Sequence, residues 1–90
     1  MSETLYTMIF DYNGGTYISQ VSGESEKTAA NSWTSKLSES DLVSWGLTPA
    51  EVRRLCDDPP TQLNNCFNVW CSSASTKSGL LLLNIVATKT

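Results

Sequence analysis

The chain contains no histidine, and this absence limits the chemistry that it can perform. Histidine is the commonest general base and the commonest metal ligand in proteins. Nucleophile pairs of the Ser-His or Cys-His type are therefore excluded, as is every metal site that needs an imidazole. Catalysis by carboxylates, lysine or tyrosine alone is not excluded. Because no motif of that kind is visible, we predict a non-catalytic protein that needs neither a cofactor nor a metal ion.

Positive charge is also scarce. Six of the 90 residues are lysine or arginine, against nine acidic residues, which gives a net charge of −3. The basic residues are scattered, and only Arg53 and Arg54 are adjacent. Binding to nucleic acids or anionic membranes needs clustered positive charge, so we expect neither partner. The longest apolar run, residues 80–83, is far too short to span a bilayer.

Cysteine usage indicates a reducing compartment. The chain has three cysteines and no Cys-x-x-Cys motif that would predict a zinc or redox site. Cys66 and Cys71 lie five positions apart in one predicted strand, which puts them on opposite faces and prevents a bond between them. The N-terminal residues also lack the basic and apolar stretches of a secretion signal. We therefore predict a cytoplasmic protein whose cysteines are packing residues.

The strongest local pattern is a β-hairpin over residues 5–21. Two runs rich in β-branched and aromatic residues flank Asn13-Gly14, a dipeptide that favours the type I′ turn. A turn at Gly14-Gly15 would set Ile9 against Gln20. We adopt the turn at Asn13-Gly14, because it sets residues of similar polarity against each other. The predicted pairs are Tyr12 with Gly15, Phe10 with Tyr17, Ile9 with Ile18, and Tyr6 with Val21.

A first helix is predicted after this hairpin. Residues 22–26 supply a capping hydroxyl and acidic side chains for the first turn, where the helix dipole favours them. The helix continues to about Leu37, and Ala30, Trp33 and Leu37 share one stripe at helical spacing. Trp33 is therefore expected in the core.

A second helix follows Thr48-Pro49-Ala50-Glu51, which forms a capping box with proline at the first helical position. Pro59-Pro60 ends it, because proline cannot continue the hydrogen-bond ladder. The adjacent Asp57-Asp58 pair is interpreted as solvated rather than as metal-binding. Between the two helices, the mostly polar residues 38–46 are compatible with a short helical turn that ends at Gly46.

The last third of the chain returns to β-structure. Strands are predicted over residues 66–71 and 80–87, joined by a flexible polar loop over 72–79. The order ββααββ, without a linker or repeat, indicates a single α+β domain over residues 1–90. We predict a four-stranded, mostly antiparallel sheet made of the two hairpins, with the two helices between them packed on one face. The strand order between the hairpins stays open.

Two short helices cover only one face of such a sheet. Alternation along the strands assigns a nearly all-apolar set to this helix-covered face: Tyr6, Met8, Phe10, Tyr17, Val21, Phe67, Val69, Cys71, Leu81, Leu83, Ile85 and Ala87. The opposite, open face is mixed but apolar at its centre. An uncovered apolar patch marks an interaction site, and tryptophan is common among interface anchors. The predicted binding residues are Ile9, Ile18, Asn68, Trp70, Leu82 and Val86.

The leading hypothesis is a protein-binding or self-associating module, most simply a two-fold dimer through the open face. The alternative for that face is that segments 38–47 and 72–79 fold over it. A second functional hypothesis is a small-molecule site between helices and sheet, lined by Tyr6, Tyr17 and Trp33. The third is an enzyme, for which two constellations are considered: Cys56 near Arg53-Arg54, and Asp11 with Tyr12 and Thr16.

Overall fold

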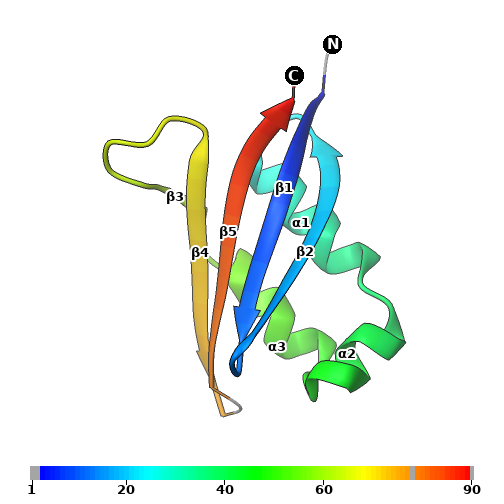
Figure 1. The fold of residues 1–90 in the computed structure, drawn as a ribbon. Coiled ribbons are helices and arrows are strands. Elements are labelled where there is room, and N and C mark those ends of the chain that lie inside the picture. The colour runs from blue at the N-terminus through cyan, green and yellow to red at the C-terminus, as the bar shows by residue number, and fades with distance from the viewer. Residues whose placement is uncertain (1–2, 78, 90) are drawn as a thin grey trace.

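The computed structural model describes residues 3–77 and 79–89. The α+β class is confirmed, with an antiparallel sheet in the order β2-β1-β5-β4-β3 and helices on one side of it (Figure 1). The strands are β1 (Thr4–Tyr12), β2 (Gly15–Gly23), β3 (Thr61–Gln62), β4 (Val69–Thr76) and β5 (Gly79–Lys89). The helices are α1 (Glu26–Lys36), α2 (Glu39–Trp45) and α3 (Pro49–Arg53), which continues into the 3-10 turn η1 (Arg54–Cys56).

The described residues contain one strand and one helix more than the four strands and two helices predicted. The extra strand, β3, is two residues long, too short for its alternation to be visible in a sequence. The extra helix, α2, replaces the predicted short turn. Ser38 and Asp41 form a capping box at its start, and Gly46 ends it with a left-handed φ of 72°.

The first hairpin has the predicted register. Asn13 and Gly14 form the turn with positive φ, and all four predicted pairs are present between β1 and β2. The strand order places β1 beside β5, so the two hairpins pair through their inner strands.

Both predicted helices are also present, with the expected starts. Ser25 caps α1, where its side chain accepts a hydrogen bond from the Thr28 amide at 3.2 Å. Thr48 caps α3 through the predicted capping box, in which its hydroxyl accepts from the Glu51 amide at 3.2 Å. Local side-chain chemistry alone fixes these boundaries, which explains why the sequence predicts them.

The prediction for the second hairpin is wrong about the extent of its first strand. The segment predicted as a loop over residues 72–79 belongs mostly to β4, which pairs with β5 as far as the Thr76–Gly79 pair. Its serines and alanine alternate between the two faces, with Ser72 buried and Ser73 exposed. Small polar residues are typical of loops, and here the pairing with a strongly apolar partner strand outweighs that preference.

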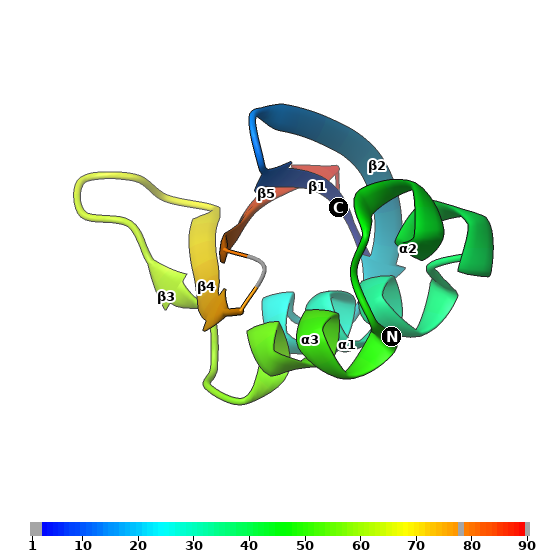
Figure 2. The ribbon, with the colours of Figure 1, turned by 90° about the horizontal axis from the view of Figure 1, so that it is seen from below.

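The sheet curls around the helices, so that its helix-covered face is concave and its open face is convex (Figure 2). The core lies between the concave face and the helices. Its fully buried side chains come from every layer: Met8 and Phe10 from β1, Leu81, Leu83 and Ile85 from β5, and Val52 and Leu55 from α3 and η1.

Phe10 joins this core to an aromatic cluster. Its ring lies 5.2 Å from that of Trp33 in α1 and 5.0 Å from that of Trp45 in α2, measured between ring centroids. Trp33 is 4% exposed, which confirms its predicted place in the core. The cluster is therefore the contact through which β1 holds two helices.

Replacing Phe10 by alanine should lower the free energy of unfolding by about 3–5 kcal/mol, because a fully buried ring leaves a cavity that three elements cannot close. Phe67→Ala is the matched control, since Phe67 is 86% exposed, and it should change stability by less than about 0.5 kcal/mol. Urea unfolding of both variants checks this. Equal losses in the two variants would contradict the packing described.

Candidate functional site

The open face presents three rows of side chains across β2, β1, β5 and β4. The central row joins Ile18, Ile9, Asn84 and Cys71, and the flanking rows are Gln20–Thr7–Val86–Val69 and Thr16–Asp11–Leu82–Ser73. These residues alternate with the buried ones, so they point away from the helices. We call the apolar members of this face, together with Leu80, the open-face patch: Ile9, Ile18, Val69, Cys71, Leu80, Leu82 and Val86.

Two of these side chains are strongly exposed, Ile18 at 67% and Leu80 at 59%. Among the described residues of the three rows only Asp11 is charged, and its carboxylate accepts a hydrogen bond from the Thr16 hydroxyl at 2.6 Å. The amide of Gln20 donates to the Thr7 hydroxyl at 3.1 Å. These two bonds join four of the polar groups beside the patch, and the patch itself consists of aliphatic side chains and the Cys71 thiol.

Two of the six predicted binding residues do not lie on the open face. Trp70 pairs with Ile85, packs against the core and meets the ring of Tyr6 edge-on at 6.1 Å, so it belongs to the helix-covered side. Asn68 precedes the strand, with a positive φ of 65°. This left-handed conformation interrupts the predicted strand of residues 66–71. The side chains that follow it therefore point to the face opposite to the one predicted.

The same shift corrects three residues assigned to the helix-covered face. Val69 and Cys71 lie on the open face, and Phe67 is in the exposed connection before β4. The other four predicted binding residues keep their place in the patch, which is therefore aliphatic and has no indole at its centre.

The chain's own loops do not hide this face in the described part of the structure. Segment 38–47 forms α2 and packs on the concave side through Leu42, Trp45 and Leu47. Residues 72–76 form part of the sheet itself. The alternative in which these two segments cover the open face is wrong (Figures 1 and 2).

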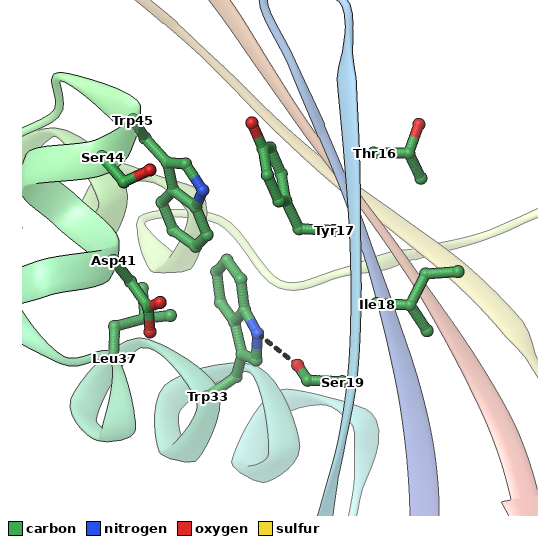
Figure 3. Close-up of a pocket in the computed structure, with 9 residues that line it drawn as sticks. All are labelled: Thr16, Tyr17, Ile18, Ser19, Trp33, Leu37, Asp41, Ser44 and Trp45. Atoms are coloured by element: carbon green, nitrogen blue, oxygen red, sulfur yellow. Dashed lines mark hydrogen bonds between the residues drawn. The ribbon is translucent and has the colours of Figure 1, made fainter.

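A second feature lies at the outer edge of β2, where a cavity of about 460 Å³ opens between this strand and helices α1 and α2 (Figure 3). Tyr17, Trp33 and Trp45 form its aromatic wall, and the Tyr17 and Trp45 rings are 5.0 Å apart. The Trp33 indole N–H donates to the Ser19 hydroxyl at 3.1 Å, which fixes this ring. Asp41 is the charged residue of the lining, whose remaining members are Thr16, Ile18, Leu37 and Ser44.

The sequence predicts this cavity only in part. Tyr17 and Trp33 are both found there, but Tyr6 lies with Trp70 at the other end of the core. Trp45 and Asp41 are missed, because the segment that carries them is mostly polar. A signal was available in the Ser38–Asp41 capping box and the glycine at position 46, which together define a helix that would bring a tryptophan back onto the sheet.

Burial keeps two of the cysteine thiols, Cys56 and Cys71, in the protonated form that is a poor nucleophile. Burial raises the pKa of the Cys56 thiol; the nearby Thr34 hydroxyl partly opposes this and the charge of Asp57 adds to it. Burial also raises the pKa of Cys71. A raised pKa keeps the thiol protonated at neutral pH, which is the opposite of what a catalytic cysteine needs.

The second enzymatic constellation is divided between the two faces of the sheet. Asp11 and Thr16 are bonded on the open face, whereas Tyr12 is 8% exposed and belongs to the core.

Among the described residues, no group of three histidine, cysteine or acidic side chains is placed to hold a metal ion. Nor does any described helix have the length and apolar character needed to cross a membrane.

Comparisons of this chain with protein-family models, curated proteins and solved structures find no match. The functional argument therefore starts from the two surfaces described above, the open-face patch and the cavity at the β2 edge.

Cysteine alkylation should follow exposure and protonation. The three cysteines are free, and Cys66 is exposed while the other two are partly buried. At neutral pH, iodoacetamide should modify Cys66 first, with Cys56 and Cys71 slower because burial raises their pKa. Peptide mapping by mass spectrometry measures the order. Selective, fast modification of Cys56 would contradict it and would revive the enzymatic hypothesis.

Proposed function

We propose that this chain is a non-catalytic module that binds a protein through its open-face patch, and that the partner is a second copy of the chain. The observation that carries the proposal is the one-sided packing of the fold. All the described helices lie on the concave side, and the convex side presents aliphatic residues from four neighbouring strands. Exposed apolar surfaces of this kind usually mark interaction sites.

The low charge of the open face is compatible with a second copy as the occupant. The chain is acidic, with a net charge of −3, so two copies repel each other, and this repulsion is smallest when they meet through a surface with little charge. The three rows of the open face carry one carboxylate, which lies at one end beside the turn of the first hairpin. A two-fold dimer brings the same patch of each copy together, and an aliphatic patch is complementary to itself.

The raised pKa of the Cys56 and Cys71 thiols supports the non-catalytic part of the proposal, and the free cysteines support a reducing, cytoplasmic location. The cavity beside Tyr17 supports a second candidate function, ligand binding. Its volume of about 460 Å³ and its aromatic wall with a few polar groups are typical of ligand sites.

Replacing Leu80 by lysine should weaken the dimer about tenfold or more, because two ammonium groups would be buried in the interface. Val43→Lys is the matched control. Val43 is 73% exposed on α2, away from the patch, and its replacement should leave the dimer unchanged. Sedimentation equilibrium of the three proteins measures the dissociation constants. A wild-type chain that stays monomeric at high concentration would contradict the proposal.

A further inference from the structure

The outer edge of the sheet at β2 has no partner strand among the described residues. This edge is nine residues long, and its positions 16–20 are all exposed. Proteins usually protect such an edge with lysine, proline or a bulge, because free backbone groups pair readily with another chain. β2 contains neither proline nor a charged residue, and its register with β1 is unbroken. The edge is therefore competent to pair.

The register shows which backbone groups are available. The two-residue turn sets Tyr12 against Gly15, and in such a hairpin the pair beside the turn is the hydrogen-bonded one. Pairing then alternates, so Tyr17 and Ser19 direct their N–H and C=O groups toward β1. Thr16, Ile18 and Gln20 direct theirs away from the sheet. An added strand would meet three consecutive outward positions.

The aromatic cavity lies over this same edge. Its lining includes Thr16 and Ile18, whose side chains point to the open face, and also Tyr17 and Ser19, whose side chains point to the helices (Figure 3). Because side chains from both faces of β2 border the cavity, the cavity lies along the outer edge of the strand and not beneath the helix-covered face. An extended chain paired with β2 would fill it, with α2 along one flank.

The chemistry of the cavity defines one side chain of that extended chain. A residue opposite Tyr17 or Ser19 would point toward the helices, into the space beside Tyr17 and Trp45 and toward Asp41. Aromatic faces bind the methylene stem and the cationic head of lysine or arginine, and the carboxylate attracts the charge. The described lining contains no basic residue to compete for this carboxylate.

We infer that the β2 edge is a second interaction site, which binds an extended segment of another protein and takes a lysine or arginine of that segment into the cavity beside Asp41. Strand addition with a side-chain pocket is an established mode of peptide recognition. A second copy fits this edge poorly, since pairing of two β2 strands would bring the acidic α2 helices, each with Glu39 and Asp41, toward each other. The site thus differs from the open-face patch in both place and partner.

The test uses the whole chain and a short blocked peptide in which valine and threonine alternate around a central lysine. Amide hydrogen exchange of the protein, followed by NMR, reports the pairing. We expect the peptide to slow exchange at Ile18 and its outward neighbours Thr16 and Gln20. A peptide with glutamate in place of the lysine should bind about tenfold more weakly. A peptide interrupted by proline should not protect these amides.

Variants of α2 test the cavity. Asp41→Asn keeps a capping side chain and should remove most of the preference for lysine over glutamate. Ser44→Lys should block binding, because Ser44 is exposed and lines the cavity. Ser40→Lys is the matched control, since Ser40 is exposed on the same helix outside the described lining, and it should bind like the wild type.

Three results would overturn the inference. The first is equal binding of the lysine and glutamate peptides. The second is protection of the outward amides by self-association in the absence of peptide, which would assign the edge to a second copy. The third is unaltered exchange at Ile18 when the peptide binds elsewhere. Leu80→Lys should bind the peptide normally, so failure of the dimer and failure of this site are separable outcomes.

Discussion

The structure depends on the pairing of β1 with β5 at the centre of the sheet. This pairing sets Met8 against Ile85 and Phe10 against Leu83, and all four side chains are fully buried beneath the helices. Because side chains alternate along a strand, burying these residues on one side commits their neighbours to the other. The helices are short and meet only the buried side, so the aliphatic residues between them stay outside. The same assignment of alternate side chains to the two faces of the sheet thus produces both the core and the open-face patch.

The sequence predicts most where the determinants are local. The Asn13-Gly14 turn specifies the first hairpin and its register, and the hydroxyl at position 48 with Pro49 and Glu51 specifies the start of α3. These features need only a few neighbouring residues to form. Consequently the α+β class, the first hairpin and four of the six predicted binding residues agree with the structure in their location.

Prediction fails where the outcome depends on distant parts of the chain. The parity of β4 follows from its pairing with β5 and from the backbone reversal at Asn68, and neither is visible in an isolated strand pattern. Trp70 therefore packs in the core. The cavity at the β2 edge forms because α2 places Trp45 against Phe10, a residue of β1 that is distant in the sequence. Such contacts are decided by packing and not by local preference.

Amide hydrogen exchange along β2 in the free monomer tests the central claim most directly. It reports which β2 amides pair with β1, and hence the register that assigns side chains to the two faces. It also reports whether the outer edge of β2 is unpaired. The account predicts alternation, with slow exchange at Tyr17, Ser19 and Val21, which pair with β1, and fast exchange at Ile18 and the other outward positions. Uniform protection along the strand would show that its edge is covered. Alternation in the opposite phase would show that the register, and with it the assignment of both faces, is wrong.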